Sequence, residues 1–275
     1  MSAGTTAGAS AGRRAVFLDV DGTIMKDGHY IPPSAIAAIR TARARGHLVF
    51  LSTGRGMAEI QGELADIGFD GAVSNGGAFA ALGDEIVAGT LFSSAEVARL
   101  QRYLEQTGIH GYFQSFDQMF ATPALPALLA AKVEGTKVPM KEFHDPADFD
   151  PARMAKLVFV TEDEDAAERA LTELGADFAV VGGTIPLPGW SSGEVAPHGV
   201  HKGGAILALL ARLGIDPADA IGIGDNWNDA EMFEVCGTSI AMGNAVPGVR
   251  DLADQVTTAI DDDGIRNAFA RNGLI

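Results

Sequence analysis

Short apolar runs alternate with longer amphipathic stretches through the first third of the chain. Buried strands are expected over 15–20, 47–52 and 71–75, where apolar residues follow one another between polar or glycine positions. Helices are expected over 32–46 and 57–68, because apolar residues recur there at helical spacing and each stretch ends at or just before a glycine. Strands that alternate with helices in this way are typical of a parallel sheet.

The last third of the chain repeats the same pattern. Strands are expected over 220–224 and 239–243, and helices over 200–214, 229–237 and 261–273. The two outer thirds therefore predict an α/β fold, with a Rossmann-like, doubly wound parallel sheet as its core.

The middle of the chain predicts a second, smaller α/β layer. A helix is expected over 93–108, two strands meeting at a turn within 110–122, and then an irregular proline-rich stretch. The strand, helix and strand expected over 156–183 complete this layer. We therefore predict a core domain made of 13–84 and 191–275, with a second domain inserted over 85–190.

Composition narrows the kinds of protein that this chain can be. Of its 275 residues 47% are hydrophobic and 20% charged, which is typical of a globular protein. The formal net charge of −16 disfavours nucleic acid or an anionic membrane as a partner, and a small anion would need local cations. Apolar runs are too short to span a membrane, and the polar stretch 1–12 predicts a disordered tail rather than a secretory signal. With a single cysteine, Cys236, the sequence favours a cytoplasmic protein.

Polar side chains follow the expected core strands at the point where each strand ends. In an open α/β sheet, ligands bind at the carboxyl ends of the strands, so we expect these side chains to converge on one edge. The residues are Asp19 and Asp21 after the first strand, Thr53, Gly54 and Arg55 after the second, Asn75 after the third, Asp225, Asn228 and Asp229 after 220–224, and Lys202 at a helix start.

Phosphoryl transfer is the chemistry that needs such a set of side chains. A phosphate monoester is a dianion that repels an attacking carboxylate, and a divalent metal ion lowers this barrier. Mg²⁺ prefers oxygen ligands, which Asp19 and Asp225 would supply. Lys202 and Thr53 would hold the phosphate oxygens, while one carboxylate attacks phosphorus and another protonates the leaving oxygen. An extended chain through Asp19 and Asp21 would place both carboxylates on one face.

The motifs DVDGT, TGR, HKGGA and GDNWNDAEMF, in this order, resemble those of the haloacid dehalogenase superfamily of phosphatases. The stretches SNGG at 74–77 and AMGNA at 241–245 narrow the resemblance to its Cof-type branch, subclass IIB. That branch carries a large α/β cap of the C2 type between its second and third motifs, where the middle of this chain lies.

The resemblance implies a role for each motif residue. Asp19 would be the nucleophile that forms an aspartyl-phosphate, and Asp21 would be the general acid and base. Mg²⁺ would be held by Asp19, Asp225 and the backbone carbonyl of Asp21. The phosphate oxygens would be bound by Thr53, Gly54 and Lys202, with supporting roles for Asp229, Asn228, Arg55 and Asn75.

Three functions are compatible with this site. The leading one is Mg²⁺-dependent hydrolysis of a small phosphorylated metabolite, such as a sugar phosphate. The second is a phosphotransferase or phosphomutase, in which the phosphoryl group passes to a sugar hydroxyl instead of water. The third is a phosphometabolite-binding protein that has lost catalysis; it would need a missing nucleophile, acid or lysine, and none of these is missing. The sequence leaves the substrate and the oligomeric state open.

Overall fold

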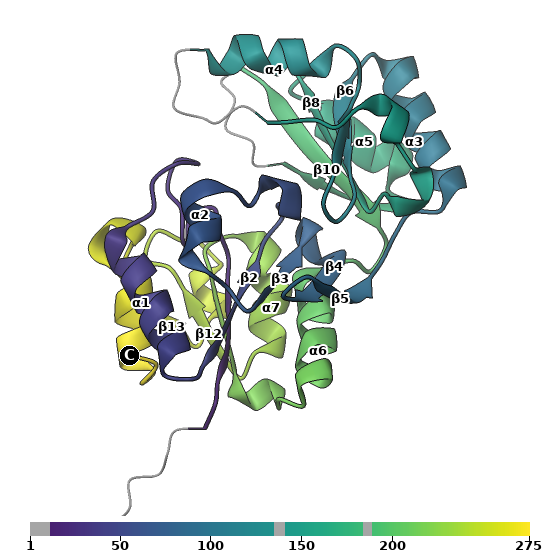
Figure 1. Ribbon diagram of the computed structural model, residues 1–275. Coiled ribbons are helices and arrows are strands. Elements are labelled where there is room, and N and C mark those ends of the chain that lie inside the picture. The colour runs from purple at the N-terminus through teal and green to yellow at the C-terminus, as the bar shows by residue number, and fades with distance from the viewer. Residues whose placement is uncertain (1–11, 135–140, 184–188) are drawn as a thin grey trace, which may run out of the picture.

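Two separate β-sheets organise the computed structural model, which describes residues 12–134, 141–183 and 189–275 (Figure 1). Of the expected tail over 1–12, only the last residue lies within these ranges. Figure 1 shows the eight-stranded sheet with its helices in the lower part of the molecule and the five-stranded sheet above it. Within the described residues no helix combines the length and apolar character needed to cross a membrane.

The larger sheet has the strand order β13-β12-β11-β1-β2-β3-β4-β5. All neighbouring pairs from β13 to β3 are parallel, whereas β4 and β5 extend the sheet as antiparallel strands. Its strands are β1 (Ala15–Leu18), β2 (Leu48–Ser52), β3 (Gly71–Ser74), β4 (Phe79–Leu82), β5 (Glu85–Gly89), β11 (Ala220–Gly224), β12 (Thr238–Ala241) and β13 (Gln255–Val256).

Helices cover both faces of this sheet because the residues of each buried strand point alternately to either side. Val16 and Leu18 of β1 pack among α1 (Pro33–Ala44), α2 (Gly62–Ile67) and α8 (Gly264–Arg271). Phe17 points to the other face, where it stacks on Phe50 of β2 with ring centroids 5.2 Å apart. That face is covered by α6 (Lys202–Leu213) and α7 (Ala230–Val235). The predicted doubly wound α/β core is confirmed.

The smaller sheet has the strand order β7-β6-β8-β10-β9, with antiparallel neighbours throughout. Two helices, α3 and α5, pack on one of its faces over Phe113 and Phe159, while α4 packs near the other over Tyr112 and Val158. This sheet forms the cap domain. Its elements are α3 (Ser94–Thr107), β6 (His110–Gln114), β7 (Met119–Ala121), α4 (Leu125–Val133), β8 (Lys156–Thr161), α5 (Ala166–Leu174), β9 (Phe178–Gly182) and β10 (Ser191–Pro197).

The two sheets divide the chain a few residues away from the expected boundaries. β5 (85–89), expected in the cap, pairs with β4 of the larger sheet, and β10 (191–197), expected in the core, pairs with β8 and β9. We therefore propose that the chain crosses between the domains over 90–93 and again over 198–201.

Two local expectations from the sequence were wrong. The stretch 57–68 is not one helix, because Gln61 is extended with φ −136° and ψ 169° and separates a short 3-10 turn over Met57–Glu59 from α2. The stretch expected as irregular contains α4, whose proline lies in the first helical turn, where its missing N–H costs no hydrogen bond.

Candidate active site

The carboxyl ends of the parallel strands meet at the edge of the larger sheet that faces the cap domain (Figure 1). Asp19 directly follows β1, Thr53 follows β2 and Asp225 follows β11. Backbone hydrogen bonds continue past the strand ends, from Asp19 N to Ile223 O (2.9 Å) and from Thr53 N to Val73 O (2.8 Å). The register of the sheet therefore fixes where these side chains begin.

Lys202 is the buried cation of this edge. It is the first residue of α6, its side chain is 1% exposed, and its Nζ lies 2.6 Å from Asp19 Oδ1 and 2.5 Å from Asp229 Oδ1. Burial alone would lower the pKa of Lys202, but the two carboxylates outweigh this effect and hold the pKa above its ordinary value. Lys202 is therefore charged, and it links Asp19, which follows β1, to Asp229 in the motif GDNWNDAEMF.

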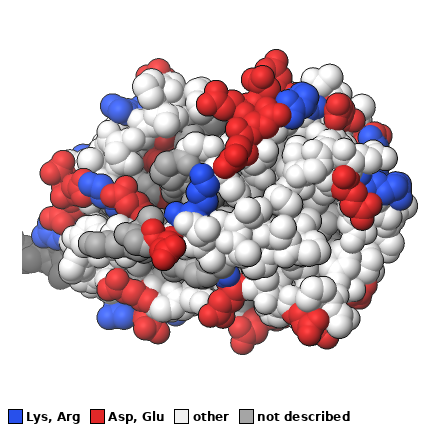
Figure 2. Space-filling model, turned by 90° about the horizontal axis from the view of Figure 1, so that it is seen from above, with Lys and Arg blue, Asp and Glu red and all other residues white. Residues whose placement is uncertain are grey.

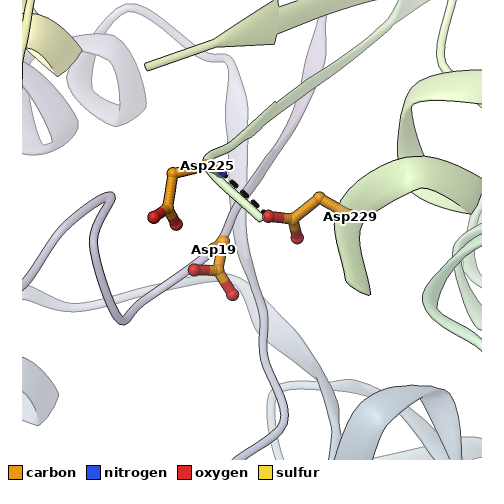
Figure 3. Close-up of side chains that lie close together, drawn as sticks. All are labelled: Asp19, Asp225 and Asp229. Atoms are coloured by element: carbon orange, nitrogen blue, oxygen red, sulfur yellow. Dashed lines mark hydrogen bonds between the residues drawn. The ribbon is translucent and has the colours of Figure 1, made fainter. Parts of the chain in front are cut away.

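Asp229 is held from several sides. Its Oδ2 accepts hydrogen bonds from the amides of Asp225 (2.9 Å) and Asn226 (3.2 Å), and its Oδ1 accepts from Lys202. Figure 3 shows the bond to the Asp225 amide and the carboxylates of Asp19 and Asp225 facing a common space. Because its oxygens are already engaged, Asp229 is suited to orient its neighbours.

The electrostatics of the site favour a bound cation. Burial raises the pKa of Asp19 well above its usual range, with Lys202 opposing and Asp229 and Asp225 adding to the rise. Burial and the nearby Asp229 raise the pKa of Asp225 to about 7. Three buried carboxylates thus share one lysine, and a further positive charge would favour their ionised forms.

The donor atoms at this edge fit Mg²⁺. Asp19, Asp225 and Asp229 each offer a carboxylate oxygen, and these oxygens lie within 4.8 Å of one another. Mg²⁺ takes oxygen ligands and is usually held by one or two carboxylates. Asp19 and Asp225 meet this need, since Asp229 already accepts bonds from Lys202 and two amides.

The loop after β1 packs closely against Asp225. Gly22 has φ +91°, and a Cβ at this position would lie 2.2 Å from Asp225 Oδ2, so that only glycine allows the approach. Thr23 Oγ1 donates to Asp225 Oδ1 at 3.3 Å. Asn244 Nδ2 donates to the carbonyl of Gly22 (2.8 Å), while its Oδ1 accepts from the amide of Ile260 (2.9 Å). The sequence placed Asn244 in a motif, AMGNA, without giving it this role.

Asp21 and Arg55 form an ion pair at the mouth of the site. Arg55 donates to both carboxylate oxygens of Asp21, at 2.6 and 2.9 Å, and the Asp21 side chain is 52% exposed. The chain turns before Asp21, because the carbonyl of Val20 accepts from the amides of three following residues. The idea of an extended chain that places Asp19 and Asp21 on one face was therefore wrong. One aspartate is buried and the other open to solvent.

Thr53 is buried behind this ion pair, in the loop that joins β2 to α2. Its Oγ1 accepts a hydrogen bond from the amide of Arg55 at 3.1 Å, which leaves the hydroxyl proton free to be donated to a ligand. The carbonyl of Thr53 accepts from Gly76 N (3.0 Å) and the carbonyl of Arg55 from Asn75 N (2.8 Å). The loop after β3 thus holds the loop that carries Thr53 in place through two backbone hydrogen bonds.

Among the described residues, neither predicted asparagine side chain is hydrogen-bonded to Asp19, Asp225 or Asp229. Asn75 turns its Nδ2 to Gln114 Oε1 (3.3 Å) and Ser115 O (3.1 Å) of the cap domain. Asn228 is exposed on the short turn before α7. Of the nearby histidines, His201 caps α6 by accepting from the amide of Gly204 at 3.3 Å, a structural role.

The contacts between cap domain and core were missed by the sequence reasoning. Gln114 Nε2 donates to Glu59 Oε2 at 2.6 Å, and Lys141 pairs with the same carboxylate. Lys156 Nζ donates to the carbonyl of Gly54 at 2.9 Å. Burial would raise the pKa of Glu59, but Lys141 and the Gly56 amide lower it below the usual value. The sequence offered one signal for these contacts, the charged residue Lys156 in the otherwise mostly apolar strand expected over 156–161.

Comparison with known proteins agrees with this architecture. A family model described as haloacid dehalogenase-like hydrolase matches residues 16–269, which is most of the chain. The chain therefore belongs to the haloacid dehalogenase-like hydrolases. Among them it is a phosphatase of the Cof-type branch, as the motifs predicted.

Relatives of similar length align over nearly the whole chain. YkrA of Bacillus subtilis is 29% identical, over 94% of this chain and 98% of its own. A phosphoglycolate phosphatase of Methanothermobacter thermautotrophicus is 27% identical over the same shares. The solved structure of the subclass IIB sugar phosphatase BT4131 is 25% identical, with a TM-score of 0.75 over 95% of this chain and 100% of that chain.

Proposed function

We propose that this protein hydrolyses small phosphate monoesters in a Mg²⁺-dependent reaction through an aspartyl-phosphate on Asp19. The observation that carries the proposal is the buried Asp19 carboxylate, held by Lys202 between Asp225 and Asp229. A buried carboxylate that a lysine holds in place at the carboxyl end of a parallel sheet is well positioned to act as a nucleophile. The class of enzyme rests on the family, whereas this mechanism is our proposal.

In the first step a carboxylate oxygen of Asp19 attacks phosphorus, and the bond between phosphorus and the leaving oxygen breaks. Asp21 would have to leave its ion pair with Arg55 for this step, and it then donates its proton to that oxygen. Lys202, the hydroxyl of Thr53 and the amide of Gly54 bind the phosphoryl oxygens while charge redistributes on them. In the second step water attacks the same phosphorus, Asp21 takes its proton, and Asp19 is released with inorganic phosphate.

The metal would be held by Asp19, Asp225 and the backbone carbonyl of Asp21, with Asp229 orienting the site. When bound, Mg²⁺ offsets the repulsion between the carboxylate and the phosphate dianion. Thr23 would keep the Asp225 carboxylate in position through its hydrogen bond.

The substrate would be a small phosphorylated metabolite, such as a sugar phosphate. The cap domain lies over the edge that carries Asp19, which suits a molecule that can be enclosed (Figure 1). Acidic side chains gather in several groups on the face seen from above, with scattered basic ones between them (Figure 2). We therefore attribute binding of a phosphate to Lys202 and the metal rather than to a basic patch on this face. Relatives that act on phosphoglycolate and on sugar phosphates support this choice.

Release of inorganic phosphate from an aryl phosphate and from a panel of sugar phosphates tests the proposal. We expect turnover with Mg²⁺, none after chelation by EDTA, and recovery when Mg²⁺ is added back. Asp19→Asn should lower kcat at least about 10³-fold, because the amide cannot attack phosphorus. Circular dichroism should show that this variant is folded.

Asp84→Asn, in the exposed turn between β4 and β5, is the matched control and should retain wild-type activity. Metal-independent turnover, or near-wild-type activity of Asp19→Asn, would contradict the proposal. An isomeric phosphoester with little free phosphate would instead identify a phosphomutase.

A further inference from the structure

A buried lysine of the cap domain reaches the loop that carries Thr53. Lys156, the first residue of β8, has a side chain that is only 3% exposed. Its Nζ donates to the carbonyl of Gly54 at 2.9 Å and pairs with Glu194 of β10 at 2.6 Å. A buried ammonium group is costly unless it is paired and hydrogen-bonded, so these two partners fix where Lys156 lies.

This hydrogen bond differs in origin from those made by the carbonyls on either side of Gly54. The carbonyls of Thr53 and Arg55 accept from Gly76 and Asn75, which belong to the core. The carbonyl of Gly54, between them, accepts from the cap domain. The orientation of the peptide unit that joins Gly54 to Arg55 therefore depends on where the cap domain sits.

That same peptide unit carries the N–H group that contacts Thr53. The carbonyl of Gly54 and the amide of Arg55 are the two ends of one planar group, so fixing one end fixes the other. The Arg55 amide donates to Thr53 Oγ1 at 3.1 Å, which leaves the hydroxyl to donate its proton elsewhere. Lys156 thus acts on the Thr53 hydroxyl through a single rigid group.

We propose that Lys156 is a positioning residue, which orients the Thr53 hydroxyl toward the phosphoryl group by holding the Gly54–Arg55 peptide when the cap domain is closed. This inference rests on the proposed function, because Thr53 is taken to bind phosphate. It makes closure of the cap part of phosphate binding itself. If Lys156 instead contacted the leaving group of the substrate, its removal would not change the binding of an anion that has no leaving group.

Inhibition by orthovanadate, which resembles the phosphoryl group alone, separates these roles. We expect Lys156→Met to raise the inhibition constant and to lower kcat on an aryl phosphate, each about tenfold, since small misplacements are enough for such effects. Lys156→Arg keeps a cation that can reach the carbonyl and should recover most of the loss. Lys141→Met is the matched control, because Lys141 also joins the cap domain to the core but pairs with Glu59. The inhibition constant of orthovanadate for the Lys141→Met variant should stay within about twofold of the wild-type value.

A double-mutant cycle with Thr53→Val tests whether Lys156 acts through Thr53. In the Thr53→Val background, adding Lys156→Met should change the inhibition constant by less than about twofold, because the hydroxyl to be oriented is gone. The same tenfold factor in both backgrounds would overturn the proposal. So would a Lys156→Met variant with an unchanged inhibition constant, or one that behaves like Lys141→Met.

Glu194→Gln provides a second route if Lys156→Met does not fold. The side chain of Glu194 is 29% exposed, so the amide is tolerated, but Lys156 loses its ion pair. The inhibition constant should rise, and an unchanged value would count against the proposal. Failure of the proposed function is distinguishable, because the wild-type protein would then neither release phosphate nor be inhibited.

Discussion

At the scale of single residues, the two aspartates of DVDGT have different surroundings. Asp19 is buried and bonded to Lys202, whereas Asp21 is half exposed and paired with Arg55. A buried, fixed carboxylate suits attack on phosphorus, and a solvent-accessible one suits exchange of protons. The structure therefore supports distinct roles for the two carboxylates, which variants can separate.

Asp21→Asn should slow the reaction according to the leaving group. An alkyl phosphate needs a proton on its leaving oxygen, so we expect kcat to fall at least about 100-fold. An aryl phosphate with an acidic phenol leaves without that help, so the first step should be much less affected. Burst kinetics with both substrates would measure this, and an equal loss in the first step would argue against Asp21 as the acid.

Lys202→Met should destabilise the fold as well as abolish activity. The substitution leaves Asp19 and Asp229 buried without their cation, and breaking a buried ion pair costs about 3–5 kcal/mol. Urea denaturation would measure the loss. Lys26→Met, which removes the exposed pair with Asp261, is the control and should change stability little. Equal stability of the two variants would contradict this reading of the site.

The single thiol should be unreactive in the native protein. Cys236 is buried at the end of α7, and burial raises its pKa to about 12. Because the thiolate is the reactive form, little of it is present at pH 8, and its fraction grows only as the pH rises toward 12. Labelling with a disulfide reagent at pH 8 should require denaturant. Rapid, stoichiometric labelling of the native protein would show that Cys236 is accessible.

At the scale of elements, a capping box in the sequence explains where helix α3 begins. Ser93 begins α3 with a capping box, in which its hydroxyl accepts from the amide of Glu96 (3.2 Å) and the Glu96 carboxylate accepts from the amide of Ser93 (2.6 Å). This local pattern is readable in the sequence, and the expected helix over 93–108 is indeed present.

Ser93→Ala should destabilise the cap domain by about 1 kcal/mol, because it leaves a helix amide without its acceptor. Thermal unfolding followed by circular dichroism would detect the change. Ser94→Ala, at the next position, removes an exposed hydroxyl outside the capping box and should have little effect. If the two variants lost equal stability, the capping box would not be the cause.

Elements were predictable where local pattern alone decides them. The strand over 156–161 and the strand over 220–224 match the structure residue for residue, because the first is built around the apolar run LVFV and the second, AIGIG, contains no polar side chain. β10 was missed because its residues, SSGEVAP, are partly polar and small, and its place in the cap sheet comes from pairing with β8 and β9. Pairing partners far along the chain leave no such local signal.

At the scale of the whole molecule, part of the site was predictable and part was not. Asp19 and Asp225 converge because strand ends of a parallel sheet share an edge, which is a rule of topology, and Lys202 joins them from the first position of α6. The contact between Lys156 and Gly54 joins positions 102 residues apart and depends on how two domains dock. Neither composition nor periodicity carries that information, so the chemistry was readable and its cap contacts were not.

Both described ends of the chain lie on the core, on the side away from the cap domain (Figure 1). The C-terminal residues pack beside α1, and Arg14 donates a hydrogen bond to the carbonyl of Asp219, which directly precedes β11. A tether at either end would therefore attach the molecule to a surface with its cap pointing outward. Such a geometry would allow dyes on the cap and core to report opening and closing in single immobilised molecules.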